Sequence, residues 1–292
     1  MKLYSVNAGY FKLDGGAMFG VVPKSIWSKT NPADEKNLCK LAMRSLLIED
    51  DAGKLILIDT GMGDKQDAKF FSHYLVPEED DTLEGSLAIL GFTREDITDV
   101  VFTHLHFDHC GGAIIRVDGA LVSAFPNATF WSNQEHWDWA VNPNPRESPS
   151  YLKENILPIQ ASGHLKFVDV ATTAINNDLL AAAPSSITEN LSFRFANGHT
   201  RAMMLPQIKY KDRTIVFAAD LLPTVGHIPL IYVMSYDMFP LVTLEERKSF
   251  FKEAADNNYV LFLQHDAVNE CCTLQHTEKG IRLKDIFKIG DI

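Results

Sequence analysis

The 292-residue chain has few cysteines and no spacing that would pair them. Cys39 and Cys110 are isolated, Cys271 and Cys272 are adjacent and cannot easily bridge each other, and no C-x-x-C occurs. A disulfide framework is therefore not expected, and this cysteine usage predicts reduced thiols in a cytoplasmic protein.

Long apolar runs are also missing. No stretch approaches the ~18 residues of a membrane span, and the N-terminal residues turn polar almost at once instead of forming the apolar core of a signal peptide. The sequence predicts no membrane association.

The chain has fewer basic than acidic residues. The chain has 27 Lys and Arg against 38 Asp and Glu, a formal net charge of -11, and no run of five basic residues. Because nucleic-acid binding needs Lys and Arg clustered against phosphates, we expect no nucleic-acid partner.

Two common functional signatures are absent. No G-x-G-x-x-G follows an expected strand, which argues against a dinucleotide-binding fold. No G-x-S-x-G occurs, so a serine nucleophile on an elbow is not expected. The content of 46% hydrophobic and 22% charged residues is ordinary for a globular protein, and we expect a single domain over residues 1–292.

Apolar periodicity and turn residues predict strands that first pair locally and then alternate with helices. We expect a helix over 242–258, with Thr243 and Glu246 as a capping box and Asn257-Asn258 at its end. The other expected elements are helices over 82–92 and from Asn133, the strand pair 41–50 and 53–61, the strands 99–104, 127–132 and 259–266, and a hairpin over 202–220. This order indicates an α/β (α+β) sandwich of two mixed sheets.

Residues 141–158 interrupt this pattern. The segment contains four prolines, which end the helix that begins at Asn133. It is predicted to be a surface excursion or a lid.

Residues 103–109, THLHFDH, concentrate titratable side chains directly after an apolar strand. Side chains two apart on a strand share a face, so His104 and His106 point the same way, and Asp108 and His109 follow where the chain turns. A lone histidine is usually a solvated bystander, but burying this group without a cation would cost several kcal/mol, about the price of any unpaired polar burial. Imidazole and carboxylate donors suit zinc, with iron or manganese as alternatives.

Further polar residues end other apolar strands. Asp59 ends LILID, His199 follows LSFRFANG, Asp220 ends TIVFAAD and His265 follows YVLFLQ. Sites in α/β proteins lie at the carboxyl ends of strands, so these residues are candidates for the same metal site.

H-x-H-x-D-H, with Asp-Thr-Gly before it and Gly-His-Thr, an aspartate and a histidine after it, resembles the metallo-β-lactamase superfamily over residues 41–266. The resemblance implies an αββα sandwich, flanked by helices, that holds two divalent metal ions. It implies one metal on His104, His106 and His199, a second on Asp108, His109 and His265, Asp220 bridging both, and Asp59 orienting the ligands from behind. A hydroxide shared by the metals would then attack a carbonyl or phosphoryl centre.

The sequence also suggests which residues act on the substrate. We expect Asp108, Asp220 and His227 to take part in catalysis, although a structural role for His227 fits its place in the sequence equally well. The substrate, a small molecule, is expected to contact a mostly apolar pocket formed by Trp137, Arg146, Tyr232 and Tyr236. Cys110 is expected to be a small buried residue, and His73, His136, His164 and His276 are expected on the surface.

Residues 16–37, 125–139 and 141–158 resemble the branch of lactonases and methyl-parathion-hydrolase-like enzymes. Compact lactonases of that branch carry a tyrosine three residues after the bridging aspartate, where this chain has Pro223. The leading hypothesis is a dinuclear hydrolase of esters or lactones, and phosphotriester or glyoxalase-II-like thioester hydrolysis is the alternative. A flavodiiron redox protein would carry Glu in place of His106, and a non-catalytic metal scaffold is the remaining hypothesis.

Residues 16–37 carry apolar side chains without core periodicity. They either pack on their own chain or form a homodimer interface. The side chains concerned are Met18, Phe19, Val21, Val22, Ile26 and Trp27.

Overall fold

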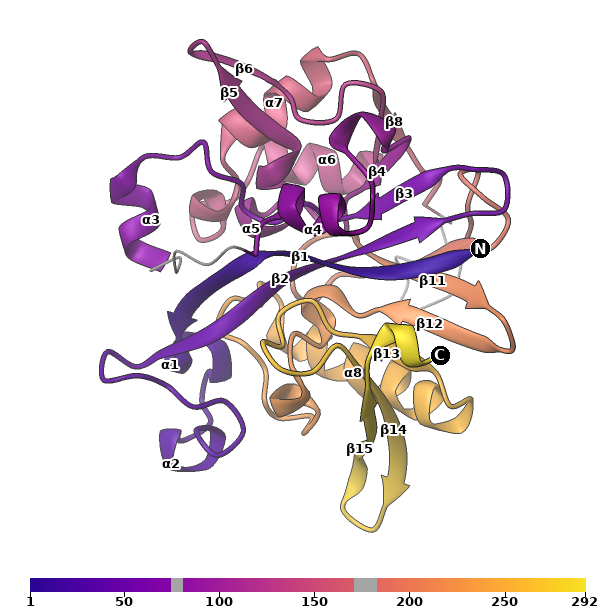
Figure 1. Ribbon diagram of the computed structural model, residues 1–292. Coiled ribbons are helices and arrows are strands. Elements are labelled where there is room, and N and C mark those ends of the chain that lie inside the picture. Colours follow the sequence, from indigo (N-terminus) through magenta and orange to yellow (C-terminus); the bar gives the residue numbers. More distant parts are fainter. Residues whose placement is uncertain (75–80, 171–182) are drawn as a thin grey trace. The chain divides into compact units, whose positions relative to one another are not determined.

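The computed structural model describes residues 1–74, 81–170 and 183–292 and divides into two compact units (Figure 1). Unit 1 comprises Met1–Tyr10, Met43–Val170 and Ser186–Thr188. Unit 2 comprises Phe11–Ala42, Ala171–Ser185 and Glu189–Ile292. Each unit is built on one large mixed sheet, as the sequence predicts.

The sheet of unit 1 has the strand order β1-β2-β3-β4-β7-β8. β2 and β3 are antiparallel, while β3, β4, β7 and β8 run parallel. The parallel strands β3 and β4 are buried along their whole length, as strands covered on both faces are, whereas β8 is partly exposed. Their bounds are β1 Lys2–Asp14, β2 Leu38–Glu49, β3 Leu55–Ile58, β4 Asp99–Val101, β7 Thr129–Ser132 and β8 Leu165–Phe167, with the end of β1 and the start of β2 counted in unit 2.

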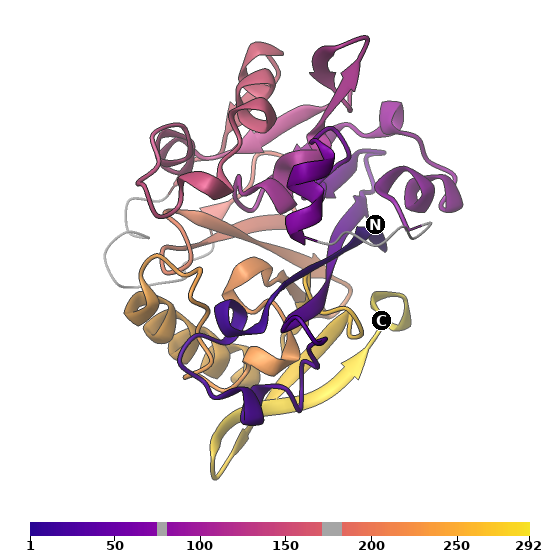
Figure 2. The same cartoon turned by 90° about the vertical axis from the view of Figure 1, so that its left-hand side faces the viewer.

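Helices cover this sheet around one apolar core that includes the stacked rings of Phe102 and Phe130. The hairpin of β5 (Ile114–Val117) and β6 (Ala120–Ser123) lies beside α7, as Figures 1 and 2 show. The helices of the unit are α3 Ala68–Tyr74, α4 Leu83–Ile89, α5 Phe107–Cys110, α6 Gln134–Val141 and α7 Lys153–Ala161. The predicted helix starts are confirmed, since Thr82 accepts from the Gly85 amide and Asn133 from the His136 amide.

The sheet of unit 2 has the order β15-β14-β13-β12-β11-β10-β9, with β12 and β13 as its parallel pair. The predicted hairpin over 202–220 is confirmed as β11 and β12, which turn at Lys211 and Asp212. The strands are β9 Ala183–Pro184, β10 Leu191–Ala196, β11 Met203–Tyr210, β12 Arg213–Phe217, β13 Val260–Phe262, β14 Cys271–Thr277 and β15 Gly280–Phe287. Two short helices, α1 (Gly15–Phe19) and α2 (Lys24–Trp27), belong to this unit.

The long helix α8, Pro240–Asp256, packs against β14 and β15. It begins two residues earlier than predicted because Pro240 occupies its first turn, so Thr243 and Glu246 lie inside the helix and form no capping box. Its predicted end is confirmed, with Asn257 as the C-cap and Asn258 left-handed at φ 51°.

The segment 141–158 is more ordered than a proline-rich loop. It contains a 3₁₀ turn, Ser148–Ser150, and the first turns of α7, which accommodates Pro158 within the helix. The predicted end of the helix that begins at Asn133 is confirmed, since α6 ends at Val141, but Lys153–Pro158 form the first turns of a new helix rather than a loop. Among the described residues, no helix combines the length and apolar character needed to cross a bilayer.

Candidate metal centre

Four potential ligands follow β4 in unit 1. His104 lies three residues after the strand ends, His106 caps the short helix α5, and Asp108 and His109 lie within that helix. All four side chains are buried, with at most 9% of any residue exposed. The H-x-H-x-D-H spacing therefore places its donors at a strand end and on one following helical turn.

The Asp59 carboxylate, which follows the last residue of β3, accepts hydrogen bonds from this motif and from Thr103 before it. Its Oδ1 accepts from the Thr103 amide at 2.8 Å, and its Oδ2 accepts from the Thr103 hydroxyl at 2.7 Å and from His109 Nδ1 at 3.0 Å. Thr60 adds two bonds to the His109 carbonyl, from its amide and its hydroxyl. The backbone at Asp59 is left-handed, φ 58°, and this conformation directs the carboxylate at the motif.

These contacts assign the tautomers of His104 and His106. The Thr103 hydroxyl gives its hydrogen to Asp59, so it accepts from His104 Nδ1 at 3.1 Å and leaves the lone pair of His104 on Nε2. His106 donates from Nε2 to Glu147 Oε1 at 3.1 Å, which leaves its lone pair on Nδ1. In the neutral imidazoles, these two lone pairs face each other across 3.1 Å.

His109 follows the same rule. Its Nδ1 donates to Asp59, so the lone pair on Nε2 is directed towards Asp108 Oδ2, 3.7 Å away. Unit 1 therefore presents a second acceptor pair beside the first.

Unit 2 holds a second donor set built on three strand ends. His199, Asp220 and His265 each lie three residues after the last residue of β10, β12 and β13. His199 donates from Nδ1 to Asp237 Oδ1 at 2.9 Å, and His265 donates from Nδ1 to the Ala42 carbonyl at 2.8 Å. Their Nε2 atoms then lie 3.2 Å and 3.0 Å from Asp220 Oδ2 and Oδ1, so one carboxylate faces two imidazoles through two different oxygens.

Hydrogen-bond acceptors that face one another repel unless a cation lies between them. Imidazole nitrogen and carboxylate oxygen are also the ligands that zinc and related divalent ions prefer. The fixed second nitrogen of each ring is also typical of metal-binding histidines. Both donor sets therefore fit divalent metal ions.

The turn before His199 depends on helix α8. Glu246 accepts from the amides of Asn197 at 2.6 Å and Gly198 at 3.1 Å, and its burial raises the pKa of the carboxyl to about 7. A Cβ at Gly198 would lie 2.3 Å from the Thr243 amide nitrogen, so only glycine fits there. Thr243 and Glu246, wrongly predicted as a cap, shape the turn that presents His199.

Three supporting residues were missed by the sequence analysis. Glu147 and Asp237 orient His106 and His199, and His136 accepts from the Leu105 amide through Nε2 at 2.9 Å. His136 is fully buried, so its prediction as a surface residue is wrong, whereas His73, His164 and His276 are exposed. No motif spacing marks these three residues, and the proline-rich setting of Glu147 indicated a loop.

His227 has a structural role. It is fully buried, stacks on Phe19 with ring centroids 4.3 Å apart, and has both ring nitrogens bonded, to the Thr224 hydroxyl and the Met18 carbonyl. Burial lowers its pKa to about 3, so the ring is neutral. These contacts contradict the expectation that His227 takes part in catalysis.

The predicted substrate-pocket residues have different environments. Trp137 is 4% exposed and belongs to the apolar core of unit 1, which corrects its assignment to a pocket. Arg146 is exposed in unit 1, and Tyr232 and Tyr236 are half-buried in unit 2. Cys110 is a buried small residue as expected, and burial raises the pKa of its thiol.

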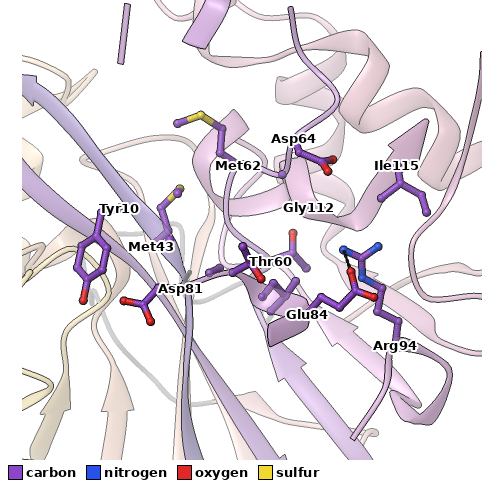
Figure 3. Close-up of a pocket in the computed structure, with 15 residues that line it drawn as sticks. Tyr10, Met43, Thr60, Met62, Asp64, Asp81, Glu84, Arg94, Gly112 and Ile115 are labelled. Carbon is purple, nitrogen blue, oxygen red and sulfur yellow. Dashed lines mark ion pairs between the residues drawn. The ribbon is translucent and has the colours of Figure 1, made fainter. Parts of the chain in front are cut away.

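Unit 1 contains a cavity of about 240 Å³ that is lined in part by the segment 60–64 (Figure 3). Thr60, Met62 and Asp64 line it from that segment, and Met43 and an ion pair between Arg94 and Glu84 at 3.6 Å line it on two other sides. Its described lining includes none of the predicted ligands or substrate-contacting residues. It is therefore a separate feature of unit 1.

Residues 44–152 match the family described as the metallo-β-lactamase superfamily. The chain has the α/β fold of this superfamily, and these residues include the H-x-H-x-D-H motif that indicated the resemblance. An N-acyl homoserine lactonase of a Bacillus species is 30% identical over 166 residues, which cover 54% of this chain and 56% of that protein. The match thus spans little more than half the length of this curated relative.

Solved structures resemble nearly the whole chain. A probable metal-dependent hydrolase from Staphylococcus aureus superposes with a TM-score of 0.84 at 26% identity, covering 98% of this chain and 96% of the other. AidC, a dizinc quorum-quenching lactonase, superposes with a TM-score of 0.77 at 22% identity, covering 97% and 93%. At this lower identity the likeness concerns the fold.

Proposed function

We propose that this protein is a metal-dependent hydrolase that cleaves a small, mostly apolar ester or lactone. The observation that carries the proposal is the pair of buried donor sets, in which each imidazole lone pair faces another acceptor while its second nitrogen is fixed by the protein. The family match over residues 44–152 and the lactonase relative support hydrolysis as the reaction.

We assign the two donor sets to two divalent metal ions, with zinc preferred because its ligands are nitrogen and carboxylate oxygen. One ion would take His104, His106 and His199, and the second Asp108, His109 and His265. Asp220 would serve both, since each of its oxygens faces a different histidine. A metal scaffold without activity would bind the same ions, so the hydrolysis test below distinguishes it from an enzyme.

The metals would supply an activated water and stabilise negative charge on the substrate oxygen. The chain's own contribution is orientation. Asp59, Glu147 and Asp237 hold the histidine rings in one tautomer, and the buried surroundings strengthen these electrostatic contacts. The ligands are therefore preorganised for the metals.

An uncharged ester or lactone fits the chain better than a polyanion. The segment 221–240, which follows Asp220, contains no lysine or arginine, and recognition of phosphate would require such residues. The relative named N-acyl homoserine lactonase makes lactones with an acyl chain the first substrates to test. Pro223 replaces the tyrosine expected there in compact lactonases, so the acyl preference would be set by other residues.

The test is hydrolysis by the zinc-reconstituted protein of N-acyl homoserine lactones, other lactones, p-nitrophenyl esters, a phosphotriester and a glutathione thioester. We expect the highest kcat/KM for a lactone or ester, loss of activity with a chelator and recovery with zinc. A kcat/KM for the phosphotriester or thioester far above every lactone and ester, or full activity without metal, would contradict the proposal.

A further inference from the structure

Glu147 is a buried carboxylate on the proline-rich excursion that follows α6. It is 1% exposed and lies 41 residues beyond His106, yet its Oε1 accepts from His106 Nε2 at 3.1 Å. The same oxygen accepts from the Tyr151 hydroxyl at 2.9 Å. A buried charge in such contact with a candidate ligand requires a reason, because its burial is costly unless it is well paired.

The other oxygen is held as firmly. Oε2 accepts from the Trp139 indole at 2.7 Å and from the Asn144 amide nitrogen at 3.3 Å. Asn144 in turn accepts from the Glu147 backbone amide at 3.1 Å, which closes a local turn around the carboxylate. Glu147 therefore meets a donor pair at each oxygen, an arrangement that suits a group that only accepts hydrogen bonds.

We propose that Glu147 is a positioning residue that fixes the Nε2–H tautomer of His106 and directs His106 Nδ1 at the metal. The excursion 141–158 then serves to carry this carboxylate rather than to act as a lid. Trp139, Tyr151 and Asn144 fix Glu147, and Glu147 fixes the ligand. The inference rests on the proposed function because it takes His106 to be a metal ligand.

Glutamine is a sharp probe of this arrangement. Glu147→Gln keeps the shape but turns one acceptor oxygen into an NH₂ group, which must face either His106 and Tyr151 or Trp139 and Asn144. In both orientations, donors oppose donors. Glu154→Gln is the matched control, since Glu154 lies on α7 of the same unit with its side chain 38% exposed and paired with Arg116.

The experiment measures stepwise zinc affinity by competition with a chromophoric chelator, together with the visible spectrum of the cobalt-substituted protein. We expect Glu147→Gln to weaken one of the zinc-binding steps ~10–100-fold, as losing a partner behind a metal ligand does, and to shift the cobalt bands. Glu154→Gln should match the wild type in both measurements. Wild-type zinc affinities and cobalt bands in Glu147→Gln would overturn the proposal.

Circular dichroism of the metal-free variants reports whether they fold. If Glu147→Gln does not fold, Tyr151→Phe removes one donor to the same oxygen and keeps the ring packed on His106, 4.8 Å between centroids. We expect Tyr151→Phe to weaken the same zinc step by a smaller factor, and an unchanged affinity in it would overturn the proposal. A weakened zinc step in a protein that hydrolyses no ester or lactone would refute the proposed function and keep the role of Glu147. A wild type that binds no zinc would refute both.

Discussion

At the scale of single residues, the second nitrogen of each histidine decides which atom is available to a metal. Carboxylates hold His106, His109 and His199, a hydroxyl holds His104, and a backbone carbonyl holds His265. Each ring is therefore limited to one tautomer. The lone pair of each ring is directed at another candidate metal ligand, either a ring nitrogen or a carboxylate oxygen.

Asp220→Ala should remove metal from both positions, because without this carboxylate the two cations would repel each other and two imidazoles would lose their common partner. We expect kcat/KM to fall by more than the ~10–100-fold typical of losing a residue behind a ligand. Metal analysis and kinetics of Asp220→Ala beside Asp212→Ala, an exposed turn residue, would check this. Two retained metals and normal turnover in Asp220→Ala would show that the assignment is wrong.

His227 should make stability depend on pH. Its folded pKa, about 3, lies below the unfolded value of 6.5, so its contribution is fully present above pH 6.5 and is progressively lost as pH falls towards 3. Between pH 7.0 and 5.5, the metal-free wild type should lose about 1 kcal/mol more unfolding free energy than His227→Gln. Urea unfolding at the two pH values measures this, with exposed His73→Gln as the control, and parallel losses in wild type and His227→Gln would contradict it.

The sequence predicts the ligands better than the residues that support them. The candidate ligands are either close together in the sequence or follow apolar strands. At His104 or Asp220, for example, a titratable side chain stands directly where an apolar run ends, and the sequence alone shows this. Glu147 and Asp237 reach the site through tertiary contacts from segments without a predicted helix or strand, where a polar residue is expected to be exposed. His136 lies on the predicted helix α6, but the sequence pattern does not show that its side chain faces the motif.

At the scale of elements, four strand ends present ligands in the same way. His104, His199, Asp220 and His265 each lie three residues beyond their strand. Apolar strands with clear boundaries were predicted because buried strands carry continuous hydrophobic runs. The prediction of a capping box was wrong because α8 begins earlier, at Pro240. Glu246 therefore lies inside the helix, where its carboxylate accepts a hydrogen bond from the Gly198 amide.

Glu246→Ala should therefore destabilise unit 2 and disturb the presentation of His199. Two buried amides, of Asn197 and Gly198, would lose their acceptor, at a cost of about 2–4 kcal/mol. Urea unfolding of the metal-free protein would detect the loss, and Glu245→Ala, an exposed neighbour on α8, should change stability little. Equal stability of the two variants would refute this role of Glu246.

At the scale of the whole molecule, most of the apolar side chains that were predicted to form a homodimer interface are not exposed. Met18, Phe19, Val22 and Trp27 are buried within their own chain, and Val21 and Ile26 remain exposed at 95% and 46%. The single domain, the cytoplasmic location and the homodimer all stay predictions. Light scattering at micromolar concentration tests the last, and a monomer mass would end it.

The central proposal is that the seven candidate ligands bind two metal ions. Elemental analysis of the wild-type protein, reconstituted with zinc and freed of excess metal by gel filtration, tests it most directly. The account predicts two zinc ions per chain, because seven ligands exceed what one tetrahedral ion can use. One equivalent or none would contradict it.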